Sequence, residues 1–150
     1  TAVTKKGAVL LCKAVRGEAS RLRLQHLSMS FIKLGTDATK VLCEWLRAYP
    51  NTLRRLALRG CHVALADVIA AVDKGCPAME VLDLGANALT ERDAVAIGRY
   101  LGARRLLDDP LAELNLSDCT KVTAKAVAAL LATLNTAVHI VLARCALGGA

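Results

Sequence analysis

Aromatic side chains are scarce in this chain: phenylalanine, tryptophan and tyrosine make up only 3% of its 150 residues, although 55% are hydrophobic. A core built from large rings is therefore excluded, and Leu, Val and Ala must fill the interior in many small, similar layers. The apolar run at 126–132 is far shorter than the ~18 residues that a membrane span requires. No stretch has the pattern of a secretory signal peptide. We therefore expect no membrane span.

The chain also lacks the sequence patterns of catalytic and metal sites. It has no glycine-rich phosphate loop, no paired-carboxylate site and no C-x-x-C pair. His26 and Ser28 share one strand face, but residues two apart on a strand lie ~6.8 Å apart, too far for the ~3 Å hydrogen bond of a nucleophilic pair. No acidic residue is placed to orient the histidine. We expect no catalytic residues, no metal and no cofactor.

One strand–turn–helix unit repeats along the sequence, and its clearest copy is 111–134. Leu114 and Leu116 alternate with polar residues, which predicts a short strand with one buried face. Thr123 occupies the expected N-cap of a following helix, whose apolar residues recur at helical spacing. These residues are Val127, Leu130, Leu131 and Leu134.

Five such copies begin near residues 24, 53, 79, 111 and 137, and their spacing is typical of a solenoid. Helices are predicted after Thr4, from about 37 to 48, through 65–72, after Thr90 and after Thr123. We expect a single domain over 1–150, with a partial repeat at 3–23 and another at 137–150. Because the chain starts without methionine and neither end shows a polar cap, we expect it to be part of a longer chain or assembly.

The repeat, read as L-x-x-L-x-L-x-x-C from Leu111 to Cys119, resembles that of leucine-rich repeat proteins. Val122-Thr123 at a helix start resembles the ribonuclease-inhibitor type, and Gly75-Cys76-Pro77 resembles the cysteine-containing type of F-box substrate receptors. The resemblance implies an α/β fold: a right-handed, curved solenoid with parallel strands on its concave face and helices on its convex face. It also implies a non-catalytic protein-binding role.

Three of the six cysteines follow the strand leucines at one fixed position of the repeat. Cys61, Cys119 and Cys145 occupy it, and Asn87 holds it in a fourth copy. We expect small, buried, unpaired thiols, which favour a reducing intracellular compartment. The cytoplasm or a cytoskeletal assembly is the expected location, and the basic amphipathic start leaves a mitochondrion as the alternative.

Partner-binding residues are expected on the concave face, at positions three, five and seven of each strand motif. Arg55 and Arg59 are the leading candidates, and their alternative role is to pair with Asp83 across the sheet. The insertion at 103–110 predicts an exposed charged loop, either a partner contact or a tolerated insertion. The concave residues are His26, Ser28, Arg55, Arg59, Asp83, Glu113, Asn115, Ser117 and His139, and the loop residues are Arg104, Arg105, Asp108 and Asp109.

Positive charge is concentrated in residues 1–36, which hold seven basic residues and one acidic residue. This segment is either a contact for an acidic partner or RNA, or a solvated helix face. The candidate contacts are Lys5, Lys6, Lys13, Arg16, Arg21 and Arg23. Three functions follow: a scaffold subunit that binds proteins of unknown identity, the substrate-recognition part of an F-box ubiquitin ligase, or an RNA-contacting subunit of a ribonucleoprotein.

Overall fold

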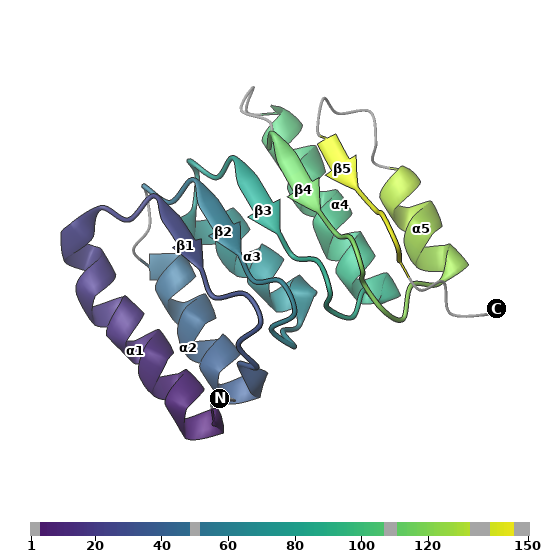
Figure 1. Ribbon diagram of the computed structural model, residues 1–150. Coiled ribbons are helices and arrows are strands. Elements are labelled where there is room, and N and C mark those ends of the chain that lie inside the picture. The colour runs from purple at the N-terminus through teal and green to yellow at the C-terminus, as the bar shows by residue number, and fades with distance from the viewer. Residues whose placement is uncertain (1–3, 49–51, 107–110, 133–138, 146–150) are drawn as a thin grey trace.

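The computed structural model describes residues 4–48, 52–106, 111–132 and 139–145, except for the side chains of residues 16, 18–22, 105 and 106. Helices and short strands alternate along the chain, so that a helix connects each strand to the next and packs behind the sheet (Figure 1). The elements are α1 (Lys5–Leu22), β1 (His26–Ser28), α2 (Gly35–Ala48), β2 (Arg55–Ala57), α3 (Leu65–Gly75), β3 (Val81–Asp83), α4 (Glu91–Leu106), β4 (Glu113–Asn115), α5 (Ala124–Leu131) and β5 (His139–Val141).

The strands form one parallel sheet in the order β1-β2-β3-β4-β5. The helices cover one face of this sheet, and the opposite face is the concave face. Equivalent motif positions lie side by side: Leu27 pairs with Leu56, Leu56 with Leu82, and Leu82 with Leu114. The copies of the repeat therefore stack in register. Leu56, Leu82 and Leu114 are at most 1% exposed, because both neighbouring repeats and the helices enclose them.

Three residues after the end of each strand, the backbone adopts a left-handed conformation. Five different residue types occupy this position, with φ between 53° and 64°: Phe31, Gly60, Ala86, Asp118 and Arg144. Such a backbone costs an L-residue roughly 1–2 kcal/mol. The next repeat offsets this cost, because the Ala86 amide donates to the Ser117 carbonyl (2.8 Å) and the Asp118 amide to the Ala143 carbonyl (2.8 Å).

The residue that follows this turn binds the preceding repeat from inside the core. The thiols of Cys61 and Cys145 donate to the carbonyls of Met29 (2.9 Å) and Leu116 (3.2 Å). In the Asn87 copy, the side-chain amide donates to Leu58 O (2.9 Å) and Leu84 O (3.0 Å), and its Oδ1 accepts from Val63 N at 3.4 Å. The predicted packing role of this position is confirmed, and all six cysteines are free.

Helix starts follow the predicted capping residues in most repeats. The Thr4 and Thr123 hydroxyls accept from the amides three residues later, at 3.1 Å each. Thr90 and Asp93 bond reciprocally, Asp93 N to Thr90 Oγ1 (3.3 Å) and Thr90 N to Asp93 Oδ2 (2.8 Å), as in a capping box. The second helix begins at Gly35, two residues before the predicted start.

The start of α3 has no cap of its own, because Ala64 stands at its N-cap. Asp93 supplies the missing acceptor from the neighbouring helix: its Oδ1 accepts from the Ala66 amide at 2.9 Å. One buried carboxylate, 6% exposed, therefore caps both α3 and α4. No helix in the described ranges is long and apolar enough to cross a membrane.

Candidate functional site: the concave face

One row of side chains at the strand starts faces outward without internal partners. The sheet register places His26, Arg55, Val81, Glu113 and His139 side by side. We call these five residues the outer row. His26, Arg55 and His139 are exposed, and no side chain of the row makes a hydrogen bond or ion pair with any described residue. Ser28, one step further along β1, is also exposed.

The next candidates along the strands are used in part by the fold. Asp83 Oδ1 accepts from the Gly85 amide (3.2 Å), and Asn115 Oδ1 accepts from the Ser117 amide (2.9 Å). In both repeats the side chain therefore bonds to the backbone two residues later, where the strand turns. These two candidates retain half-exposed side chains, but one oxygen of each is already committed.

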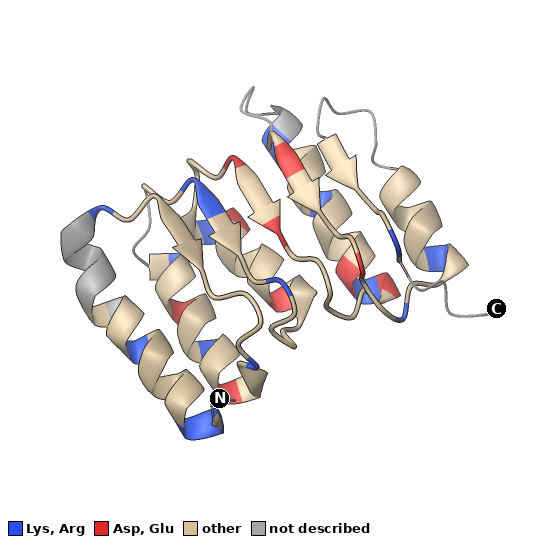
Figure 2. Cartoon of the chain, in the orientation of Figure 1, with Lys and Arg blue, Asp and Glu red and all other residues tan. Residues whose placement is uncertain are grey.

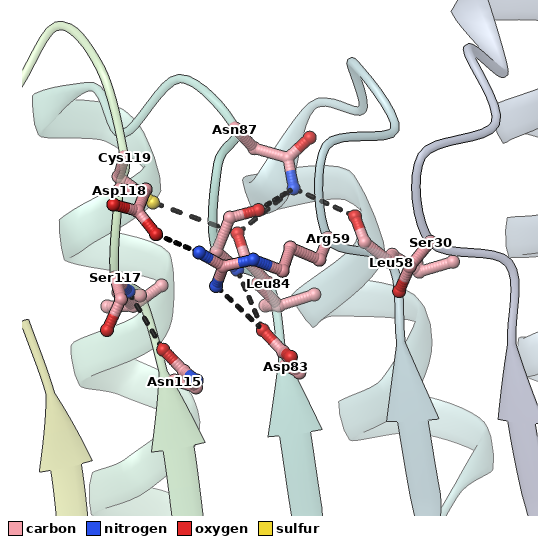
Figure 3. A network of polar contacts seen from close by, with 12 residues as sticks. Ser30, Leu58, Arg59, Asp83, Leu84, Asn87, Asn115, Ser117, Asp118 and Cys119 are labelled. Carbon is pink, nitrogen blue, oxygen red and sulfur yellow. Dashed lines mark hydrogen bonds and ion pairs between the residues drawn. The ribbon is translucent and has the colours of Figure 1, made fainter.

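Arg59 lies across the sheet and bridges three repeats. Its guanidinium pairs with Asp83 (Nη1 to Oδ1, 3.7 Å) and reaches on to Asp118 (Figure 3). The predicted pairing of Arg59 with Asp83 is confirmed, whereas Arg55 takes no part in it among the described residues. Only 19% of its side chain is exposed, so the main contacts of Arg59 are those that join neighbouring repeats.

Ser117 was expected to face a partner, and the structure shows that this is wrong. Ser117 is only 4% exposed. Its backbone lies in a crowded place beside Gly85 of the neighbouring repeat: a Cβ on Gly85 would collide with the Arg59 guanidinium and lie 2.6 Å from the Ser117 carbonyl oxygen. Because Gly85 has no side chain, Arg59 can pass over it, close to the Ser117 backbone.

Asp118 and Arg144 complete a chain of alternating charges at the strand ends. Arg144 Nε donates to Asp118 Oδ1 (2.8 Å) and Nη2 to Oδ2 (3.1 Å). Hydrogen bonding from Arg144, with a further contribution from Arg59, lowers the pKa of Asp118, and the same bond raises the pKa of Arg144. We refer to Arg59, Asp83, Asn87, Asn115, Asp118 and Arg144 as the polar network.

The arginine predicted for an exposed loop, Arg104, lies instead inside the structure. Helix α4 continues to Leu106, and Arg104 is 6% exposed. Its guanidinium donates to Pro77 O (3.2 Å) and Met79 O (2.7 Å) of the preceding repeat and lies over the Tyr100 ring. The expected exposure of Arg104 is therefore wrong. The Arg105 side chain, Asp108 and Asp109 lie outside the described residues.

The basic N-terminal candidates lie on the helix at one end of the stack. Figure 2 shows basic residues along α1. Lys5, Lys6, Lys13 and Arg23 are exposed, while the side chains of Arg16 and Arg21 lie outside the described part of the structure. A helix that packs against α2 on one side only leaves such residues in solvent, so their exposure agrees equally with a contact and with a solvated face.

Comparison with known proteins supports the architecture. No protein-family model matches the sequence. Over 84 residues, the chain is 29% identical to Protein CARMIL of Dictyostelium discoideum, a stretch that covers 56% of this chain and 8% of that protein. The structure resembles the tropomodulin C-terminal domain of Caenorhabditis elegans, with a TM-score of 0.64 and 13% identity over 95% of this chain and 83% of that chain. The fold is a leucine-rich repeat solenoid.

The buried cysteines are held in their protonated form. Burial raises the pKa of the Cys12, Cys43 and Cys119 thiols to about 11 and that of Cys76 to about 12. At neutral pH these thiols remain protonated and poorly nucleophilic. Within the described ranges, no group of three or more His, Cys, Asp or Glu side chains could hold a metal ion.

The sequence patterns did not point to Asp118 or Arg144 as parts of the concave face. Both occupy the left-handed turn position of the solenoid repeat, where the other copies have Phe, Gly and Ala. Their opposite charges at equivalent positions of consecutive repeats were the available clue, because equivalent residues of stacked strands lie ~4.8 Å apart.

Proposed function

We propose that this chain is a non-catalytic protein-interaction module, a scaffold subunit within a larger intracellular assembly, and that it binds a protein partner through the outer row of its concave face. The observation that carries the proposal is the contrast between this row and the polar network. Arg55 and both histidines of the row are exposed and have no partner among the described residues.

The energetic argument favours the outer row because its side chains are free to exchange water for a partner. A partner that pairs with Arg55 breaks no existing ion pair, whereas one that recruits Arg59 must first break its bonds to Asp83 and Asp118. Arginine is also among the residues that contribute most to the binding energy of protein interfaces. We therefore assign the main contacts to His26, Arg55 and His139, with Ser28 and Glu113 beside them.

The intracellular part of the proposal is supported by the cysteines. All six are free, and five of them are buried. Such a set of unpaired thiols suits a reducing compartment.

A charge reversal at one exposed arginine tests the proposed surface. Proteins captured by the wild-type chain are quantified by mass spectrometry beside those captured by Arg55→Glu and by Lys125→Glu, which makes the same charge change on an exposed site of α5. The proposal expects proteins that the wild type and Lys125→Glu retain and Arg55→Glu loses, with unchanged circular dichroism. Equal capture by both variants would move the binding site away from the outer row.

The two other functions predicted from the sequence differ in what they require. A substrate receptor for ubiquitin ligation would use the same concave face, so Arg55→Glu would also remove its substrate. RNA binding would instead use α1, whose sequence contains no aromatic residue on which a base could stack. Reversal of Lys5 and Lys6 would abolish salt-sensitive RNA binding if α1 provided it.

A further inference from the structure

A second surface lies at the edge of the solenoid where strands turn into helices. It is a groove of about 750 Å³, lined by the side of α2 from Gly35 to Arg47, by 62–64 and Asp67 at the start of α3, and by the turns 86–88 and 120–121. We call it the turn-edge groove. It shares no residue with the outer row. It crosses four consecutive repeats, so at ~4.8 Å per repeat it is ~14 Å long, the length of about four residues of extended chain.

The charge of the groove is strongly positive. Lys40, Arg47 and Lys121 line it and form no hydrogen bond or ion pair through their side chains with a described residue. The acidic lining residue is Asp67, and its Oδ1 already faces Arg92 Nη2 at 3.4 Å. The groove therefore offers three cations that have no partner among the described residues, two at the α2 end and one at the far end. Figure 2 shows basic residues on α2.

Several of the residues that line the groove between these cations have small or buried side chains. Val63 and Cys43 are buried at 5% and 3% exposure, and Ala64, Ala86 and Ala88 have only methyl side chains. Thr36 and Thr120 add exposed hydroxyl groups at opposite ends. A backbone can approach such a surface closely. His62 is the one ring-bearing side chain in this lining, and the groove has no Phe, Tyr or Trp on which successive bases could stack.

We propose that the turn-edge groove binds an extended acidic segment of a protein partner. Carboxylates at the two ends of the segment pair with Lys40 and Arg47 and with Lys121, while small side chains between them lie on the alanines. Charge complementarity sets the sign of the ligand, and the length of the groove sets its extended form. This surface is separate from the proposed concave contact, and its test does not depend on that contact.

A defined peptide probe tests the proposal. Fluorescence anisotropy follows a fluorescein-labelled peptide of alternating glutamate and alanine as the intact chain is added. We expect binding to the wild type and an affinity about tenfold weaker for the double variant Lys40→Glu with Lys121→Glu. The matched control is Lys13→Glu with Lys125→Glu, which makes the same charge change at exposed sites outside the groove and should bind almost as well as the wild type.

A steric variant separates the groove from general electrostatic attraction. Ala64 is exposed, and its side chain caps nothing, so Ala64→Trp fills the groove without changing the charge or removing a bond. It should abolish peptide binding while Arg55 stays accessible for the concave partner. Equal weakening by the two charge variants, or full binding by Ala64→Trp, would overturn the proposal. So would tighter binding of an RNA oligomer of equal charge that Ala64→Trp removes.

Discussion

The starts and the ends of the five strands carry different kinds of polar side chain. At the starts, the outer row is exposed or half-exposed and its side chains have no hydrogen-bond or ion-pair partner among the described residues. At the ends, the polar network joins side chains of four repeats, from Arg59 to Arg144. The difference indicates that an outward-facing side chain is available to a partner only where no side chain of a neighbouring repeat pairs with it. Arg55 and Arg59 lie four residues apart on one repeat, yet Arg55 is exposed and Arg59 is paired with Asp83 and Asp118.

The largest expected effect comes from the buried member of the polar network. Asn87→Ala removes hydrogen bonds to Leu58 and Leu84 and leaves both carbonyls without this partner in the core. We expect a loss of about 3 kcal/mol in the free energy of unfolding, measured by urea denaturation. Asn115→Ala, which removes one half-exposed bond, is the control and should cost about 1 kcal/mol. Equal losses would contradict a special role for Asn87.

The crossing of Arg59 over Gly85 predicts the next effect. In Gly85→Ala the added methyl group meets both Arg59 and the Ser117 carbonyl, so we expect a loss of about 2 kcal/mol in unfolding free energy. Adding Arg59→Ala should relieve part of this loss. Gly102→Ala is the matched control, because nothing lies within 4 Å of its Cβ position on α4. That control should stabilise the protein by about 0.5–1 kcal/mol.

The Asp118–Arg144 pair predicts a smaller effect that depends on pH. Because the folded pKa of Asp118 is lowered, its contribution to stability is present above its unfolded pKa and is lost as the pH falls through the folded value. Asp118→Asn should therefore be less stable than the wild type at pH 7, and the difference should begin to shrink below about pH 4 and vanish only below the lowered folded pKa. Arg144→Gln should produce the same pH profile in thermal unfolding. A difference that persists in acid would exclude the ion pair as its source.

The smallest effect is expected in the outer row. Arg55→Ala removes an exposed side chain that bonds to no described residue, so the unfolding free energy should change by less than about 0.5 kcal/mol. Arg59→Ala should cost more, because it leaves Asp83 and Asp118 without their shared cation. Equal effects in the same denaturation experiment would remove the distinction between row and network.

The strand register, the buried cysteines and the helix caps were predictable because each depends on a local pattern repeated along the chain. Leu56 and Leu114 occupy the same motif position, so stacking makes them neighbours with no further information. The left-handed turn residues were not predictable, since Phe31, Ala86 and Asp118 share no chemistry. Hydrogen bonds that their amides donate to carbonyls of the next repeat hold them in that conformation.

The candidate site was predictable where exposure follows from strand alternation alone. His26 and Arg55 lie as expected for this reason. The positions of Ser117 and Arg104 depend on residues in other repeats. Gly85 lets Arg59 pass beside Ser117, and the carbonyls of Pro77 and Met79 hold Arg104 inside. Such contacts between different repeats are not visible in the sequence pattern of any single copy.

The carboxylate of Asp93 ties two helix starts together, and this affects how the molecule unfolds. Solenoid repeats ordinarily fray one after another from an end, because each contacts only its neighbours. Here the amides of Ala66 and Thr90 share one acceptor group, so neither helix can release its first turn without disturbing the other. Hydrogen exchange at the two amides should report a single opening event, which makes α3 and α4 one cooperative folding unit.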